Sequence, residues 1–146
     1  MVSRFLKRDK VETLARLPLF DACSRRELAQ VASISVDMTR PAGTLLTREG
    51  RDGGLLFVIL EGDAEVTRDG TVIGELGSGD VVGELSLIDG QARSASVRAV
   101  TDVHVLEIAA DDLRALVRIS PKITRNLLRA LSLRIRHTEE RWPAEL

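Results

Sequence analysis

The middle of the chain carries the feature that most constrains its fold, a series of short apolar runs separated by turn-forming residues. This pattern extends from about Ile34 to Ile108. Glycine and proline at such short intervals leave little room for helices and are typical of consecutive short strands. The pattern therefore predicts strands that close into a sandwich or roll. The turn formers are Pro41, Gly43, Gly50, Gly53, Gly54, Gly62, Gly70, Gly74, Gly77 and Gly79.

Two segments of this stretch predict particular strands. Leu55 to Leu60 is a continuous apolar run suited to a buried strand. The dipeptide Asp69-Gly70 is a hairpin signal because its glycine accepts a positive φ, and it lies between the apolar residues Val66 and Val72. We therefore expect a hairpin that turns at Asp69 and Gly70.

Helices are expected before the strands. Ser24 and Glu27 match a capping box at the start of an amphipathic segment. A shorter helix should precede it and break at Pro18, because proline lacks the amide donor that a helix interior needs. The apolar residues behind these predictions are Leu28, Val31 and Ala32 for the amphipathic helix, and Leu14, Leu17, Leu19 and Phe20 for the shorter one.

Two further helices are expected after the strands. Asp111 and Asp112 should open the first, as caps and as negative charges at the positive end of the helix dipole. Pro121, after Ser120, should begin a longer helix that reaches about Arg141, since proline is favoured at the first helical position.

The chain has the size of one domain, at 146 residues. We predict a mainly β domain over residues 1–146, a jelly-roll-like β-roll of antiparallel strands with N-terminal and C-terminal helices. The expected boundaries are about 9–35 for the N-terminal helices, 36–108 for the β-roll and 111–141 for the C-terminal helices.

Charge and composition narrow the function. The formal net charge of -1 gives no global field that would attract DNA or an anionic membrane. With one Trp and no Tyr, stacking on nucleic-acid bases is disfavoured. The single Cys23 cannot form an intramolecular disulfide, and no segment resembles a signal peptide or a membrane span of ~20 residues. We expect a cytoplasmic protein that binds neither DNA nor a membrane directly.

The sequence points to neither catalysis nor a metal. His104 lies in an apolar run and is expected to be a strand side chain, while His137 belongs to a helix surface. Two separated histidines and one cysteine make no cluster with metal-ligand spacing. No combination of Ser, His and an acid stands out for nucleophilic catalysis. The prediction is a binding protein, not an enzyme, with no metal or cofactor.

The segment from Gly83 to Val97, G-E-L-S-L-I-D-G-Q-A-R-S-A-S-V, is the most informative. Gly83 lets the backbone approach a ligand closely. The first amides of a helix beginning near Glu84 can donate to a phosphate, because they have no acceptor within the helix. Arg93 adds a permanent positive charge with planar donors, and Ser94 adds a hydroxyl. The segment therefore has the groups of an anion site.

Glu84 indicates what else the ligand carries. A carboxylate in a phosphate-binding loop repels the phosphate, so Glu84 makes chemical sense only if it contacts another part of the ligand. A ribose hydroxyl is a good candidate because it can donate to the carboxylate. A cyclic nucleotide offers both groups, one phosphate charge fused to a ribose that keeps its 2′-hydroxyl.

This segment resembles the phosphate-binding cassette of the cyclic nucleotide-binding domain family, whose pattern is roughly F-G-E-L-x-L followed by P-R-x-A-x-V. Residues 82–97 contain V-G-E-L-S-L and A-R-S-A-S-V. The resemblance continues through L-P-L-F at 17–20, P-A-G-T-L-L-T-R-E-G at 41–50 and L-L-F-V-I-L-E-G at 55–62. Within the family, the chain looks most like the sensor domain of the catabolite activator family of bacterial transcription regulators, which share Q-x-R-S-A with residues 91–95.

The resemblance implies roles for individual residues. The family's glutamate that matches Glu84 binds the ribose hydroxyl, and the arginine and serine that match Arg93 and Ser94 bind the cyclic phosphate. The implied ligand is cAMP, and less so cGMP, whose selective relatives often carry threonine at the serine position. Val82 and Ala92 replace the usual aromatic residue and proline, which could loosen the cassette but keeps both charged contacts. The expected ligand-binding residues are Gly83, Glu84, Leu85, Ser86, Arg93, Ser94, Ala95 and Thr138.

The predicted C-terminal helix carries a stripe of residues spaced three and four apart. Such heptad spacing is typical of a helix-pairing seam, so a parallel homodimer could bury it, and the alternative is that it covers the chain's own β-roll. In the catabolite activator's dimer helix a threonine that matches Thr138 contacts the adenine amino group, whereas Glu139 departs from the serine that follows it there. Trp142 could instead cover the base as an apolar lid within one subunit. The stripe comprises Leu128, Leu131, Ile135, Thr138 and Trp142.

Three functions are consistent with these observations. The first is a stand-alone cyclic nucleotide sensor that signals to an unidentified effector protein through its C-terminal helix. The second is the sensor portion of a transcription regulator. It requires a longer gene product, because Pro143 to Leu146, which follow Trp142, cannot encode a helix-turn-helix. The third is a ligand-free structural or interaction module with the same fold.

Overall fold

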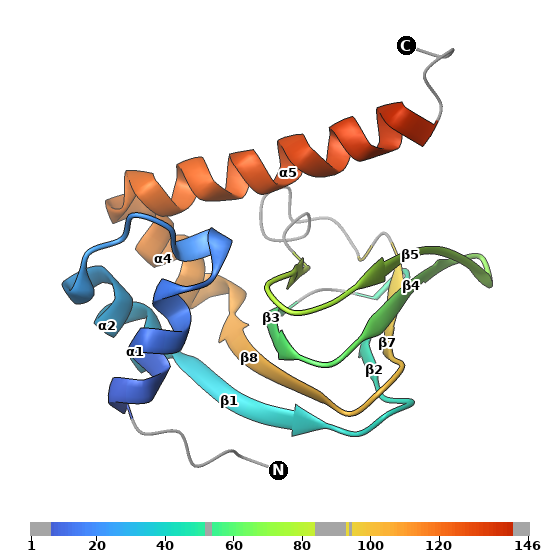
Figure 1. The fold of residues 1–146 in the computed structure, drawn as a ribbon, viewed down its shortest axis with the longest axis horizontal. Coiled ribbons are helices and arrows are strands. Elements are labelled where there is room, and N and C mark those ends of the chain that lie inside the picture. Colours follow the sequence, from blue (N-terminus) through green and yellow to red (C-terminus); the bar gives the residue numbers. More distant parts are fainter. Residues whose placement is uncertain (1–6, 52–53, 84–92, 94, 142–146) are drawn as a thin grey trace.

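The computed structural model describes residues 7–51, 54–83, 93 and 95–141 (Figure 1). Its helices lie before and after a continuous series of short strands. The helices are α1 (Lys7–Ala15), the 3-10 helix η1 (Pro18–Phe20), α2 (Arg25–Ile34), α4 (Ala110–Ile119) and α5 (Pro121–Arg141). The strands are β1 (Ser35–Arg40), β2 (Leu45–Thr47), β3 (Leu55–Glu61), β4 (Ala64–Arg68), β5 (Thr71–Leu76), β6 (Val81–Val82), β7 (Ser96–Ala99) and β8 (Val103–Ala109).

The strands form two antiparallel sheets. The strand order is β1-β8-β3-β6 in the first sheet and β2-β7-β4-β5 in the second. The helices gather at one side of this roll, with α1 and α2 at the left of Figure 1 and α5 across the top. The predicted mainly β fold with flanking helices is confirmed. The strands run from Ser35 to Ala109, one residue beyond the expected boundary at each end.

Strand β3 lies between two cores, which explains its uninterrupted apolar sequence. Leu56 and Val58 belong to the core that the roll shares with the helices. Phe57 and Ile59 belong to a second core inside the roll. Because successive side chains of a strand point to opposite faces, a strand with a core on each side has no solvent-facing position between its two ends. The predicted buried strand is confirmed except at its first residue, Leu55, which is exposed.

The hairpin between β4 and β5 turns where the sequence predicts. Arg68 pairs with Thr71, so Asp69 and Gly70 form a two-residue turn. Their φ angles are +51° and +78°. Two consecutive positive φ values are what a type I′ turn requires, and they match the right-handed twist of the two strands.

Helix α2 begins with the predicted capping box. The Ser24 hydroxyl accepts a hydrogen bond from the Glu27 amide at 3.1 Å, and a Glu27 carboxylate oxygen accepts one from the Ser24 amide at 2.9 Å. The three residues of its predicted apolar stripe are all buried: Leu28, Val31 and Ala32.

One of two expected helix boundaries agrees with the structure and the other differs. Helix α1 ends at Ala15 and Pro18 begins the separate helix η1, so the predicted break lies next to this proline, whose fixed φ suits a first helical position. The N-cap of α4 is Ala109, so Asp111 and Asp112 do not cap this helix and lie in its first turn. Their charges there still favour the helix dipole. Pro121 begins α5, as predicted.

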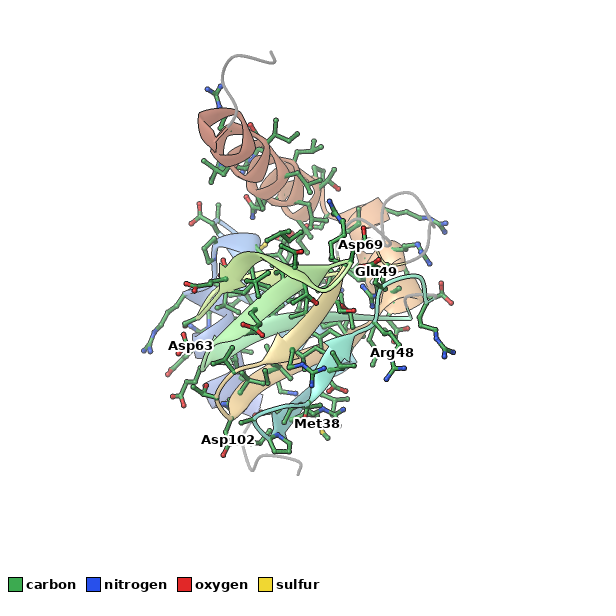
Figure 2. All side chains as sticks on the ribbon, turned by 90° about the vertical axis from the view of Figure 1, so that its right-hand side faces the viewer. Met38, Arg48, Glu49, Asp63, Asp69 and Asp102 are labelled. Carbon is green, nitrogen blue, oxygen red and sulfur yellow. The ribbon has the colours of Figure 1, made fainter. Side chains whose placement is uncertain are left out.

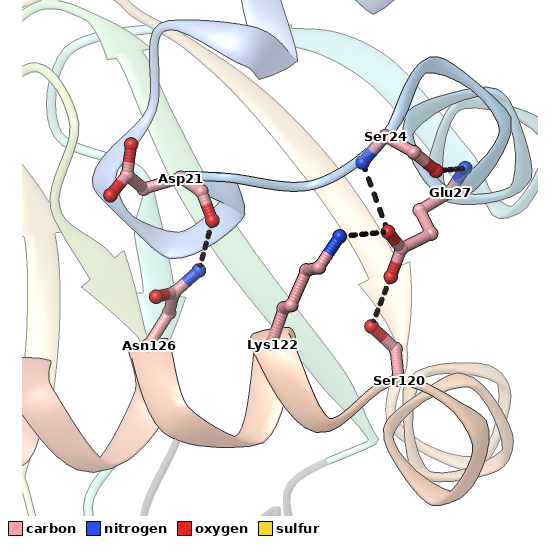
Figure 3. A network of polar contacts seen from close by, with 6 residues as sticks. All are labelled: Asp21, Ser24, Glu27, Ser120, Lys122 and Asn126. Atoms are coloured by element: carbon pink, nitrogen blue, oxygen red, sulfur yellow. Dashed lines mark hydrogen bonds and ion pairs between the residues drawn. The ribbon is translucent and has the colours of Figure 1, made fainter.

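Polar contacts fix the start of α5 to the N-terminal helices (Figure 3). Glu27 accepts hydrogen bonds from the Ser120 hydroxyl at 2.6 Å and from Lys122 Nζ at 3.2 Å. Asn126 Nδ2 donates to the carbonyl oxygens of the last turn of η1 and of its C-cap, each at 2.9 Å. The hydrogen bond from Ser120, followed by that from the Ser24 amide, lowers the pKa of Glu27 from 4.5 to about 2. We call Glu27, Ser120, Lys122 and Asn126 the anchor network.

Helix α5 changes from buried to exposed along its length. Ile123 and Leu127 are buried beside the anchor network, whereas Leu128 and Ile135 have exposed fractions of 61% and 60%. These two residues of the predicted stripe therefore do not cover the β-roll in this structure. The side chain of Thr138, like the whole of Trp142, lies outside the described residues. Among the described helices, none combines the length with the apolar content that a bilayer crossing requires.

Candidate functional site

Arg93 is a buried cation, with only 8% of its surface exposed. Its Nη2 donates a hydrogen bond to the Leu55 carbonyl oxygen at the start of β3. Its Nη1 is buried and has no hydrogen-bond partner within the described residues. Desolvation by burial lowers the pKa of this guanidinium, although arginine remains charged at neutral pH. A buried charge with an unsatisfied donor is costly, and a bound anion would remove that cost.

Gly83 makes room for the Arg93 guanidinium. Its φ is +97°, and a Cβ added there would lie 2.0 Å from Arg93 Nη1 and 3.1 Å from the Leu55 carbonyl oxygen. A side chain at this position would therefore displace the guanidinium. The sequence predicts that Gly83 permits a close approach of the backbone, and the group that approaches it in this structure is the arginine itself.

The backbone on both sides of Arg93 is held by the segment that follows β2. The Arg93 amide donates to the Arg51 carbonyl oxygen, and the Gly50 amide donates to the Arg93 carbonyl oxygen, each at 2.9 Å. Thr47 Oγ1 donates to the Ala95 carbonyl oxygen at 3.1 Å. These contacts extend the antiparallel pairing of β2 with β7 and fix where the Arg93 side chain starts.

A pocket of about 190 Å³ opens beside this arginine. Ligand pockets usually measure ~300 to 1,000 Å³, so the hollow among the described residues has room for part of a nucleotide. Its wall contains both apolar side chains and guanidinium groups, which suits a ligand with an anionic group and a less polar remainder. The lining residues are Leu46, Thr47, Arg48, Arg51, Gly54, Leu55, Phe57 and Arg93.

The structure brings together some of the predicted site residues. Gly83 and Arg93 are in contact, and Ala95 is bonded to Thr47, which lines the same pocket as Arg93. Thr138 is on α5 near its end. The remaining predicted contacts lie outside the described residues and stay predictions: Glu84, Leu85, Ser86 and Ser94.

Sequence reasoning did not single out Arg48 and Arg51, which also line the pocket. The segment P-A-G-T-L-L-T-R-E-G carries part of the resemblance to the family, but no role is predicted for its arginine, and it ends just before Arg51. The signal that could have found these arginines is two positive charges beside Gly50, in a loop that follows a strand.

His104 is a strand side chain, as predicted. It lies on β8, and its Nε2 forms a hydrogen bond with Asp37 Oδ1 on β1. Within the described residues, no group of three or more His, Cys, Asp or Glu side chains is arranged to hold a metal ion.

Comparison with protein families gives one match over most of the roll. The sequence model of the cyclic nucleotide-binding domain matches residues 38–120. This range contains both sheets except the first residues of β1, together with the pocket and α4.

Individual relatives and solved structures agree with this match. A cyclic nucleotide-gated potassium channel of Rhizobium etli is 36% identical over 80% of this chain and 32% of the channel. A CRP-like cAMP-activated global transcriptional regulator of Mycobacterium tuberculosis is 30% identical over 87% of this chain and 59% of the regulator. The crystal structure of a cyclic nucleotide-binding domain from Methylobacillus flagellatus has a TM-score of 0.79 at 28% identity, over 96% of this chain and 84% of that one. The chain thus spans less than two thirds of either curated relative.

Proposed function

Because the chain belongs to the cyclic nucleotide-binding domain family, we propose that it is a sensor that binds cAMP in preference to cGMP and catalyses no reaction. The observation that carries this proposal is the buried Arg93 guanidinium. It lies in the wall of a pocket, its Nη1 has no partner among the described residues, and a ligand phosphate would satisfy both the charge and the donor.

The proposed placement of the ligand begins at Arg93, which binds the cyclic phosphate. Ser94 adds a hydroxyl donor beside it, and Glu84 accepts a hydrogen bond from the ribose 2′-hydroxyl. Thr138 would contact the adenine amino group from α5. Support for adenine comes from Ser94 and from the Mycobacterium tuberculosis relative, whose name states that cAMP activates it.

The proposed signal is a rearrangement of α5. Its first turns are held by the anchor network, and the exposed Leu128, Leu133 and Ile135 lie beyond that network. If the nucleotide binds more tightly when the second half of α5 approaches the pocket, the ratio of the two affinities sets the largest possible population shift. We propose that this half of α5 also pairs two copies of the chain as a homodimer, which would bury the exposed apolar side chains.

The decisive experiment is a calorimetric titration of the protein with cAMP and with cGMP. The proposal expects saturable binding of cAMP with one site per chain and weaker binding of cGMP. Absence of binding by both would leave the third candidate, a ligand-free module with this fold.

A second form of the proposal is the sensor portion of a longer transcription regulator. The observation that favours it is that the chain spans 59% of the Mycobacterium tuberculosis regulator. The mass of the natural protein, measured in its source cells, decides between this form and a stand-alone cytoplasmic sensor.

A further inference from the structure

The pocket carries more positive charge than Arg93 supplies. Arg48 and Arg51 also line it, and no carboxylate is among its described lining residues. Both side chains are exposed, and neither forms an ion pair with another described residue. The described wall therefore has one buried guanidinium and two solvated ones.

The acidic residue between the two arginines in the sequence is held elsewhere. Glu49 Oε1 accepts a hydrogen bond from the Asp69 amide at 3.1 Å, at the tip of the β4–β5 hairpin. Figure 2 shows Glu49 next to Asp69 and apart from Arg48. The Glu49 amide donates to Ser96 Oγ at 2.9 Å, which fixes the backbone at this point. The hairpin tip thus keeps the Glu49 carboxylate out of the pocket lining.

Exposed and buried charges act on a ligand in different ways. Solvated arginines contribute little to the stability of a contact, because water and salt screen them and their side chains lose entropy on binding. Their field nevertheless extends into solvent and raises the local concentration of an oppositely charged ligand at a cleft with apolar walls. Leu46 and Phe57 provide such walls here.

We propose that Arg48 and Arg51 steer an anionic ligand into the pocket and so set its association rate, whereas Arg93 sets its residence time. This inference rests on the proposed function, because it takes a cyclic nucleotide as the anion. The two roles separate cleanly in kinetics: removal of a steering charge lowers the association rate constant and leaves the dissociation rate constant nearly unchanged.

The test is stopped-flow binding of a fluorescent cAMP analogue, labelled on the base, to Arg48→Gln, Arg51→Gln and the double variant. At an ionic strength of ~10 mM, where screening extends over ~30 Å, each substitution should slow association about twofold to fivefold. At ~1 M salt the variants and the parent should associate at nearly equal rates. Arg26→Gln is the matched control, because it removes the same charge from an exposed position on α2 outside the pocket. It should leave association unchanged.

Two results would overturn the steering role. One is a double variant that associates as fast as Arg26→Gln at low salt. The other is a loss that resides in the dissociation rate and persists at high salt, which would make these arginines direct contacts.

Inorganic phosphate provides a readout that does not depend on nucleotide binding. Phosphate is titrated at low salt into isotope-labelled protein. It should shift the backbone amide NMR signals of residues 47–51 clearly in the parent and much less in the double variant. If the parent binds neither cAMP nor cGMP, the proposed function is wrong and the phosphate titration alone decides the inference. A parent whose signals in this segment do not respond to phosphate would refute it.

Discussion

Replacing Arg93 with alanine should separate ligand binding from folding. Arg93 lines the pocket and is only 8% exposed, so the ion pair that it would form with a ligand phosphate is largely desolvated. Breaking such a pair by removing one partner typically costs ~3 to 5 kcal/mol, which is roughly a hundredfold to several thousandfold in affinity. We therefore expect cAMP binding to fall close to or below the detection limit of calorimetry.

The same substitution should not destabilise the ligand-free protein. Among the described residues, the Arg93 side chain makes one hydrogen bond, to the Leu55 carbonyl oxygen, and its Nη1 is buried without a described partner. Alanine removes the desolvation cost of that charge together with the hydrogen bond to Leu55. The melting temperature of the ligand-free variant should therefore equal or exceed that of the parent.

Calorimetry with cAMP and thermal denaturation without ligand test both halves of this prediction. Arg93→Lys keeps a charge but loses the planar donors, so its affinity for cAMP should lie between that of the parent and that of Arg93→Ala. Arg26→Ala, at an exposed position on α2, is the control for general effects of losing an arginine. A variant without Arg93 that binds cAMP as tightly as the parent would refute the assignment of the site. A large fall in melting temperature would refute the argument about its buried charge.

Four other changes have definite expected outcomes. Gly83→Ala should lower the affinity for cAMP in calorimetry, because its Cβ would lie 2.0 Å from Arg93 Nη1. The control is Gly43→Ala, which also has a positive φ, of +90°, but has open space around its Cβ, so its affinity should equal that of the parent. Glu84→Gln should weaken cAMP binding roughly tenfold to a hundredfold, the equivalent of ~1.5 to 3 kcal/mol for a hydrogen bond to a charged group. Equal affinity of the parent for cAMP and 2′-deoxy-cAMP would contradict that role. The pKa of Glu27 is about 2 in the folded protein against an ordinary 4.5, so its contribution to stability should be complete above pH 4.5 and disappear as the pH falls toward 2. Urea denaturation of the parent and Glu27→Gln should show a gap that closes over this interval, and a constant gap would argue against the pKa as its source. Nucleotide should slow hydrogen exchange in the second half of α5 and the protein should scatter light as a dimer, whereas a monomer with unchanged exchange would remove this helix from the mechanism.

Local sequence patterns predicted the parts of the fold that depend on neighbours in the chain. The capping box of Ser24 and Glu27, the turn at Asp69 and Gly70, and strand β3 all need only a few consecutive residues. The exception is the start of α4, where β8 runs directly into the helix, so the N-cap falls on Ala109 and its aspartates come too late to cap.

Contacts between distant segments could not be predicted in this way. Ser120 and Lys122 reach Glu27 across 93 and 95 residues, and nothing in the capping box indicates that its carboxylate will bind them. For the candidate site, Gly83 and Arg93 were predicted because one motif contains both. Arg48 and Arg51 join them only through the pairing of β2 with β7, and in the sequence alone they are ordinary surface charges.

Because the anchor network lies near the start of α5, a small tilt of this helix at the network would move its far end by a larger distance. The helix has 21 residues, and the last residue of the network is Asn126, with the buried Leu127 and the exposed ion pair of Arg129 with Asp21, at 3.7 Å, just beyond it. At 1.5 Å per residue, the part beyond the network is roughly 20 Å long, so a tilt of about 10° at the anchor moves the far end by ~4 Å. In the proposed signal, a displacement at the pocket smaller than an atomic diameter would therefore be enlarged at the end of the helix to the scale of a side chain, which would be enough to change the contacts of the helix with an effector protein.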